Sequence, residues 1–484
     1  HIDFANVNRK SCKNSVCKQI LKHKKGFCMT NNTIKQGVLF RGLNKKNVAV
    51  QFDQDHASSD GGAILLKTVD DRLNLSKTLA ACLSDTRQQS KVLHSLQELF
   101  QQRMFSIACG YEDANDAARL ANDPVFKLLT GRDPVQGPAL ASQPTLSRFE
   151  NGVRRGDLLR MAEGLAATVI NRHKRRKKKA KLITIDLDPT EDPAHGSQQL
   201  SLFNWFYDCN CYLPLAGFLT FDQEPEQYLF CYLLRPGNAS AKLGCLGLLK
   251  RLLPRLRKAF PGARIRIRLD SGFTGPELYA FFEAQGLEYV VGMGKNSVLL
   301  DLAEPAMDVV RTDRDNDIKT ICYDDTRYAA HSWPHERRVI IKGQITYHED
   351  RKPKENPRFV ITNVKGSPQH IYEKIYCARG DAENRIKELK NGLQIDRTSC
   401  TSFMANQLRV LLTAAAYVLF QELRLHARHT GHARAQVTTL RLHLLKLGAW
   451  VESSVRRIVV HLPTSMPYLD DWRRIARSVG AIPT

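Results

Sequence analysis

Three acidic side chains are candidates for metal-assisted chemistry on a phosphodiester. Asp188 and Asp270 each come at the end of a predicted strand, and Glu383 lies on a helix predicted from 368 to about 390. Hard divalent cations prefer oxygen ligands such as carboxylates. Two Mg²⁺ ions about 3.5–4 Å apart activate a nucleophile and stabilise the leaving oxygen. Acids at strand ends are common, so these positions need a second, independent signal.

The predicted helix around Glu383 supplies that signal. Tyr376, Arg379, Glu383 and Lys390 are spaced so that, at about 100° per residue, all four fall on one face about 60° wide. A buried apolar stripe would not align Arg, Glu and Lys. An exposed face with ion pairs is one explanation. A metal-binding carboxylate flanked by phosphate-binding cations is the other, and it also accounts for Tyr376.

The elements that must position these residues form an alternating series. The patterns predict strands over 182–187, 212–221, 228–234, 264–269 and 288–292, and helices over 241–260 and 275–285. A hairpin start followed by β–α alternation implies an α/β fold with one mixed sheet and helices against it. The three-strand meander would lie to one side, so the first and fourth strands, which carry Asp188 and Asp270, would be neighbours.

Asp186 competes with Asp188 for the position of the first ligand. The two residues have the same parity and point to the same face of the strand. Periodicity therefore does not choose between them.

The region before the sheet is predicted to be mainly helical, from about 64 to 170. Within it, a helix over 142–151 would present Arg148 and other polar side chains, with Leu146 and Phe149 facing the core. Such a helix is a candidate for reading a major groove. The alternative is an ordinary surface helix.

The charge of the chain favours a polyanionic partner. Lys and Arg number 72 against 49 Asp and Glu, which gives a net charge of +23. Hydrophobic residues make up 43% of the chain, which is ordinary for a folded globular protein. Eight Lys or Arg residues fall within 172–181, and of these Lys174, Arg175 and Arg176 are predicted DNA contacts. The alternative for this tract is a solvated linker.

A membrane is the second polyanionic candidate, and the sequence disfavours it. The most apolar run, 410–420, is shorter than the roughly 18 residues that a spanning helix needs. The beginning of the chain lacks the pattern of a signal peptide. We therefore expect no membrane partner and a cytoplasmic location.

Two further features concern the cysteines and the first residues. The twelve cysteines include no Cys-x-x-Cys pair, which favours reduced structural thiols over zinc or disulfides. Residues 1–28 carry seven basic residues and one acidic residue, and the first Met is Met29. We interpret 1–28 as a non-native leader rather than a functional basic arm.

The four-residue pattern at Tyr376, Arg379, Glu383 and Lys390 resembles the Tyr-Arg-Glu-Lys signature of bacterial insertion-sequence DDE transposases. Other segments agree: Leu-Asp-Pro-Thr at 187–190, Asp-Pro-Ala-His-Gly at 192–196, Arg-Leu-Asp-Ser-Gly-Phe at 268–273 and Gly-Tyr-Glu-Asp-Ala-Asn-Asp at 110–116. The chain is most similar to the thirteen-eighty group of insertion sequences, from about residue 36 onward.

This resemblance implies a ribonuclease H-like catalytic domain in which Asp188, Asp270 and Glu383 bind two Mg²⁺ ions, for which Mn²⁺ can substitute. The family's Asp-x-Thr pattern fits Asp188 rather than Asp186. Tyr376, Arg379 and Lys390 would then contact DNA phosphates. Related transposases stack an insertion-domain Trp on a flipped base, a role for which Trp333 is the candidate. A packed aromatic is the alternative for Trp333.

The implied domain plan has six parts. They are the leader 1–28, a helical DNA-binding domain 29–170, the catalytic domain in two parts (171–294 and 366–400), a β-rich insertion 295–365, and a mostly helical C-terminal region 401–484.

The implied function is that of a bacterial, nucleoid-associated, cut-and-paste transposase. It would bind terminal inverted repeats and target double-stranded DNA as a homodimer, then perform Mg²⁺-dependent cleavage and strand transfer, with a hairpin intermediate suggested by the resemblance. Two alternatives stay open: a non-catalytic DNA-binding repressor derived from a transposase, and a metal-dependent DNA nuclease without strand transfer.

Overall fold

The computed structural model describes residues 37–43, 45–315, 320–348 and 351–483, and it separates the chain into two compact units. The unit that ends at Asp55 contains an antiparallel hairpin of β1 (Val38–Leu43) and β2 (Lys46–Val50). Every other element belongs to the unit His56–Thr484. The predicted leader 1–28 lies outside the described residues.

The central sheet contains the five predicted strands in the predicted chain order. They are β4 (Leu182–Pro189), β8 (Leu215–Phe221), β9 (Tyr228–Leu233), β10 (Arg264–Leu269) and β11 (Glu288–Met293). The spatial order β11-β10-β4-β8-β9 has β4 parallel to β10 and antiparallel to β8. The prediction of a mixed sheet, with the first and fourth strands as neighbours, is confirmed.

The helices within this series are α8 (Cys245–Ala259) and α9 (Pro276–Ala284). A small second sheet, which the sequence patterns did not predict, precedes β8. It joins β5 (Asp192–Pro193), β7 (Cys209–Tyr212) and β6 (Leu202–Asn204) in that spatial order.

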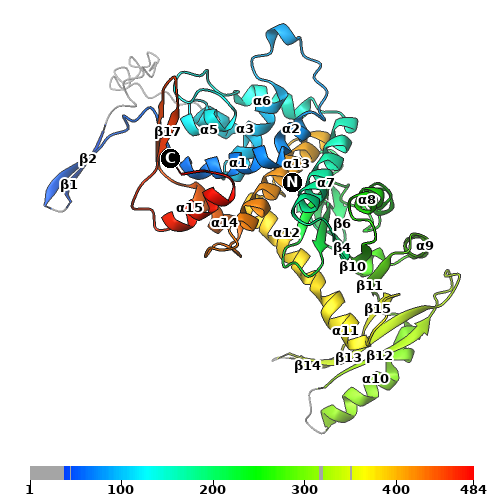
Figure 1. Ribbon diagram of the computed structural model, residues 1–484. Coiled ribbons are helices and arrows are strands. Elements are labelled where there is room, and N and C mark those ends of the chain that lie inside the picture. Colours follow the sequence, from blue (N-terminus) through cyan, green and yellow to red (C-terminus); the bar gives the residue numbers. More distant parts are fainter. Residues whose placement is uncertain (1–36, 44, 316–319, 349–350, 484) are drawn as a thin grey trace, which may run out of the picture. The chain divides into compact units, whose positions relative to one another are not determined.

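The described residues of the segment 295–365, which was predicted to be a β-rich insertion, form one helix and four strands. It contains α10 (Ser297–Asp315), β12 (Ile321–Tyr328), β13 (Arg337–His348), β14 (Arg351–Glu355) and β15 (Arg358–Thr362). β15 pairs with β11, so β12, β13 and β15 extend the central sheet (Figure 1). The pairing with β15 covers the edge of β11, which would otherwise present unpaired backbone N–H and C=O groups.

Helix α10 was not predicted, because charged residues obscure its apolar stripe. Leu299, Ala303, Ala306 and Val310 are buried at helical spacing, and the helix packs on β12 and β13.

The region before the sheet is helical from residue 64 onward, as predicted. Its helices are α1 (Ile64–Leu73), α2 (Leu75–Ala80), α3 (Leu96–Ala108), α4 (Ala117–Leu120), α5 (Pro124–Leu129), α6 (Gln143–Asn151) and α7 (Arg155–Arg176). Local signals set several ends: the Asp123 carboxylate accepts a hydrogen bond from the Phe126 N–H and Pro124 begins α5, while Ser95 and Glu98 form a capping box at α3.

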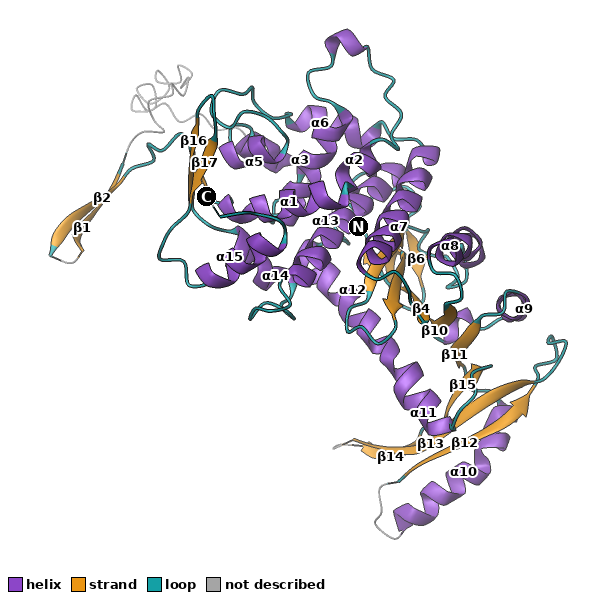
Figure 2. Cartoon of the chain, in the orientation of Figure 1, coloured by secondary structure: helices purple, strands orange, loops and turns teal. Residues whose placement is uncertain are grey.

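Helix α13 (Phe403–His426) unites these helices with the sheet. It packs against α1, α3, α6 and α7, which gather around it in Figure 2, and against β9. The outer edge of β9 is satisfied by α13, because the Gln421 and Gln407 side-chain oxygens accept hydrogen bonds from the N–H groups of Leu229 (3.0 Å) and Leu234 (2.8 Å). α13 is long and apolar enough to cross a membrane, yet 89% of its most apolar window is buried in the protein.

The rest of the C-terminal region mixes helices and strands. Its elements are α14 (Val437–Leu440), β16 (Ala449–Ser453), β17 (Ile458–His461) and α15 (Leu469–Ser478). β16 pairs with β3 (Ala57–Ser58), so the region predicted as C-terminal shares a sheet with the start of the helical region. The described cysteines all have free thiols.

The helical stretch that carries Glu383 runs from α11 (Pro368–His370) to α12 (Gly380–Leu393), as one rod in Figure 1. Between these helices lie a π-helical turn (Ile371–Tyr376) and a 3₁₀ turn (Cys377–Arg379). Such irregular turns occur frequently at functional sites.

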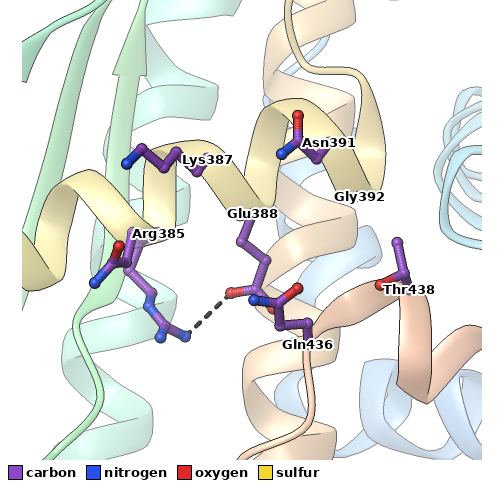
Figure 3. A pocket seen from close by; sticks show the side chains of 8 residues that line it. Arg385, Lys387, Glu388, Asn391, Gly392, Gln436 and Thr438 are labelled. Carbon is purple, nitrogen blue, oxygen red and sulfur yellow. Dashed lines mark hydrogen bonds and ion pairs between the residues drawn. The ribbon is translucent and has the colours of Figure 1, made fainter.

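The C-terminal half of α12 is anchored by a buried carboxylate. Glu388 accepts hydrogen bonds from Arg385 (3.0 Å, Figure 3), from the Tyr417 hydroxyl (2.7 Å) and from Arg424. Because Tyr417 and Arg424 belong to α13, this network fixes the helix of Glu383 to the central core helix.

Candidate active site

Asp188 and Glu383 meet at one guanidinium group. Asp188 lies at the end of β4 and is 8% exposed. Arg379 Nη1 lies 3.0 Å from Asp188 Oδ2, and Arg379 Nη2 lies 2.5 Å from Glu383 Oε1. The structure therefore brings together two of the three predicted acids, 195 positions apart in the chain, through a third predicted site residue.

Asp270 lies close enough to Asp188 and Glu383 for its charge to interact with theirs. It caps the 3₁₀ turn after β10, where its Oδ1 accepts a hydrogen bond from the Gly272 N–H at 2.9 Å. Burial raises the pKa of Asp270, and the charge of Glu383 adds to that rise while Arg379 opposes it. Burial likewise raises the pKa of Asp188 to about 7, with Asp270 and Glu383 both contributing. These carboxylates lie near enough to disfavour one another's charged forms.

Asp186 has a different environment although it points to the same face. It is fully buried, and both its oxygens accept hydrogen bonds from Arg268, at 2.5 and 2.8 Å. Arg268 also donates to the Ile375 carbonyl oxygen at 2.9 Å. Asp186 therefore joins β4, β10 and the π-helical turn, and Asp188 is the aspartate of β4 that stays near the other acids.

The Tyr376 hydroxyl group packs against the backbone of Gly292, where no side chain is present. A Cβ atom at Gly292 in β11 would lie 2.4 Å from the Tyr376 hydroxyl oxygen and 3.0 Å from the Ser271 backbone nitrogen. Any larger residue at position 292 would push Tyr376 away from the turn that follows Asp270.

Lys390 contacts the loop that follows β4. Its Nζ donates to the Glu191 carbonyl oxygen and to Glu191 Oε1, both at 2.7 Å. Sequence reasoning did not single out Glu191. The sequence feature that could have indicated Glu191 is its position three residues after Asp188, since Lys390 lies on the same predicted helix face as Glu383.

Trp333, a predicted DNA-contacting residue outside this group, is buried. It is 9% exposed, and its ring packs edge-on against Tyr279 and Tyr328 with the Arg337 guanidinium 5.3 Å from its centroid. This packing is compatible with the packed-aromatic alternative, and a contact between Trp333 and a DNA base stays a prediction.

Arg148 is exposed on α6, while Leu146 and Phe149 are buried as predicted. The basic tract 172–181 begins inside a helix, because α7 continues to Arg176. Lys174 and Arg175 are exposed there, whereas Arg176 forms an ion pair with Glu224 at 2.5 Å.

The donor set fits a divalent cation by its chemistry. Among the described residues, no group of three or more His, Cys, Asp or Glu side chains is arranged closely enough to hold a metal ion. The Arg379 guanidinium instead provides the positive charge between Asp188 and Glu383. Buried acids with raised pKa values are groups whose charged forms a divalent cation would stabilise.

Acidic side chains at the ends of adjacent strands and on a neighbouring helix provide carboxylate oxygens, the ligands that divalent cations prefer, and pairs of such cations occur in phosphatases, polymerases and nucleases. The chain belongs to the family described as Transposase DDE domain group 1, whose sequence model matches residues 40–483. The protein is accordingly a transposase of the DDE type, from a family of DNA-cutting enzymes that act in transposition of mobile elements with divalent metal ions. A search of the curated proteins finds no match for the chain.

Proposed function

We propose that this protein is a cut-and-paste transposase that binds the terminal inverted repeats of its insertion sequence, cleaves DNA in a Mg²⁺-dependent reaction and transfers the freed strand to target DNA. The observation that carries this proposal is the meeting of Asp188 and Glu383 at Arg379, beside the turn of Asp270. The strand order β11-β10-β4-β8-β9 supports a ribonuclease H-like domain around this site.

Asp188, Asp270 and Glu383 would hold two Mg²⁺ ions, for which Mn²⁺ can substitute. When bound, the ions supply activation of the attacking hydroxyl and stabilisation of the leaving oxygen. The chain's own residues would position the substrate. Arg379, which lies between Asp188 and Glu383, would contact DNA phosphates together with Tyr376 and Lys390. Glu383 and these three phosphate-contacting residues would form the Tyr-Arg-Glu-Lys signature of insertion-sequence DDE transposases, and we propose that the chain is most similar to the thirteen-eighty group.

Binding of the two element ends would fall to other parts of the chain. The helical region before residue 170, with Arg148 exposed on α6, would recognise the terminal repeats, and Lys174 and Arg175 would contact phosphates of any sequence. Two ends must be held together for strand transfer, so we propose a homodimer in the DNA complex.

The test is the substitution Asp270→Asn. The variant should bind terminal-repeat DNA as the unaltered protein does but should not cleave it in Mg²⁺, because the amide replaces an anionic ligand. Gel-shift and cleavage assays on the same DNA measure both properties. Asp301→Asn, on the exposed side of α10, is a matched control that should retain cleavage.

Full cleavage by Asp270→Asn would contradict the proposed mechanism. A strand-transfer assay distinguishes the remaining possibilities: cleavage without joining would indicate a nuclease, and footprinting of the repeats without cleavage would indicate a repressor.

A further inference from the structure

The turn between β6 and β7 exposes two large aromatic side chains next to each other. Trp205 is 90% exposed and Phe206 is 86% exposed. Phe203 packs edge-on against Trp205, and Tyr207 against Phe206, each with ring centroids 4.9 Å apart. A cluster of exposed aromatic rings usually marks a binding surface.

The backbone of this turn is held in place by Asn204. Its side-chain oxygen accepts hydrogen bonds from the N–H groups of Phe206 (3.0 Å) and Tyr207 (3.3 Å), and its amide nitrogen donates to the Gly237 carbonyl oxygen (2.7 Å). A Cβ atom at Gly237 would lie 2.2 Å from the Leu202 carbonyl oxygen, so the two segments pack tightly. The exposed rings are therefore preorganised, which lowers the entropy lost on binding a ligand.

The aromatic turn is attached to both sides of the candidate active site. Its small sheet begins with β5 at Asp192, four residues after Asp188. The segment after Gly237 reaches the turn that follows Asp270, where Ala241 Cβ lies 3.0 Å from the position of a Cβ on Gly272. Burial raises the pKa of Tyr207 to about 12, and the charges of Glu191, Asp188 and Asp270 add to that rise.

A cation lies near the turn that follows Asp270. Lys242 is exposed, and its Nζ lies 3.0 Å from the position of a Cβ on Gly275, close to the same turn. Among the residues that the structure describes, no ion pair involves Lys242. Exposed aromatic rings and an unpaired cation around one site are the groups that bind single-stranded nucleic acid, since bases stack on the rings and phosphates contact the cation.

We propose that Trp205 and Phe206 stack on unpaired nucleobases of the DNA strand that enters the active site, and that Lys242 contacts the phosphate backbone of that strand. The inference rests on the proposed function, because it requires DNA at the acidic site. It assigns a base-contacting role to the turn between β6 and β7.

The test measures binding in EDTA, so that no cleavage is needed. The probes are a fully paired duplex oligonucleotide and the same duplex with a short unpaired stretch that contains 2-aminopurine. The unaltered protein should bind the unpaired probe more tightly and quench its fluorescence. The double variant Trp205→Ala/Phe206→Ala should lose about tenfold or more in affinity for the unpaired probe, while its affinity for the paired duplex stays unchanged.

Two further variants sharpen the result. Trp450→Ala removes a 40% exposed tryptophan from β16 and should keep the preference for unpaired DNA. Lys242→Gln should weaken binding of the unpaired probe and reduce its salt dependence by about one phosphate contact. Because the substituted side chains are exposed, the Tm of each variant should match that of the unaltered protein.

The failing outcomes are distinguishable. Equal affinity of the unaltered protein for both probes, or an unchanged preference in the double variant, would overturn this inference and leave the proposed function standing. If the unaltered protein bound neither probe, the proposed function would fail as well. If the double variant lost only self-association, measured by light scattering, the rings would form an interface between protein copies and the inference would be wrong.

Discussion

Arg268 and Arg379 give the two aspartates of β4 different environments. Arg268 binds both oxygens of Asp186 inside the protein, whereas Arg379 binds one oxygen of Asp188 and also Glu383. Asp186 and Asp188 point to the same face of β4, yet Asp186 forms a buried ion pair with Arg268 while Asp188 belongs to the acidic group with Glu383. A buried ion pair is sensitive to the loss of one partner, because the remaining charge stays desolvated.

Substitution of the two aspartates should therefore have opposite consequences. Asp186→Ala should lower the free energy of unfolding by about 3–5 kcal/mol, since it leaves Arg268 buried without its partner. Asp188→Ala should leave that free energy nearly unchanged or higher, since it removes an acid whose burial disfavours its charge, but it should abolish cleavage. Urea unfolding and the DNA cleavage assay measure the two effects. A stable, fully active Asp188→Ala protein would show that Asp188 is not a ligand.

The end of α7 illustrates how an element redistributes charges that look uniform in sequence. Because the helix continues to Arg176, His173 is turned into the core, where it stacks on Phe221 with centroids 3.6 Å apart. Arg176 and Lys177 bind Glu224, while Lys174 and Arg175 stay exposed. Burial alone would raise the pKa of Glu224, but hydrogen bonds from Lys177 and Tyr228 lower it to about 2.

The stability of this helix end should depend on pH through His173. Burial lowers the pKa of His173 to about 3 in the folded protein, against about 6.5 when unfolded. As the pH falls below about 6.5, the unfolded chain takes up a proton that the folded chain does not, so the free energy of unfolding decreases.

Between about pH 7.5 and about pH 5 this one group should account for a loss of up to about 2 kcal/mol. The variant His173→Phe keeps a ring against Phe221 and should show a correspondingly smaller loss over the same range. Denaturant unfolding of both proteins at each pH measures the difference. Parallel pH profiles for the two proteins would contradict the assignment.

At the scale of the whole molecule, α13 is the element on which the other parts depend. It packs on the helices before the sheet, covers the edge of β9 and holds α12 through Tyr417, Arg424 and Glu388. The six-part plan expected from the sequence stays a prediction, and the helical, sheet and C-terminal regions from His56 onward share one compact unit. The net charge of the whole molecule, +23, favours binding to a polyanion such as DNA.

Salt dependence provides the matching prediction. The double variant Lys174→Gln/Arg175→Gln should weaken binding to DNA of any sequence and should reduce the slope of log K against log salt concentration by nearly two. Fluorescence anisotropy over a salt series measures the slope. Arg176→Gln is the matched control: its charge is paired with Glu224, so it should change the slope less and lower Tm instead. An unchanged slope in the double variant would place the DNA path elsewhere.

The sequence by itself determined the chain order of the central strands β4, β8, β9, β10 and β11 with helices α8 and α9. It also determined the helices before the sheet, the cap of α5 by Asp123, and the acids and cations on the helix around Glu383. These features follow from local periodicity and from hydrogen bonds between residues close in the chain. The tertiary structure decided which aspartate of β4 is paired with Arg268, that Trp333 is enclosed, that β12, β13 and β15 extend the central sheet, and that Trp205 and Phe206 are exposed. Periodicity reports which face of an element is apolar, but the partner on that face comes from distant parts of the chain.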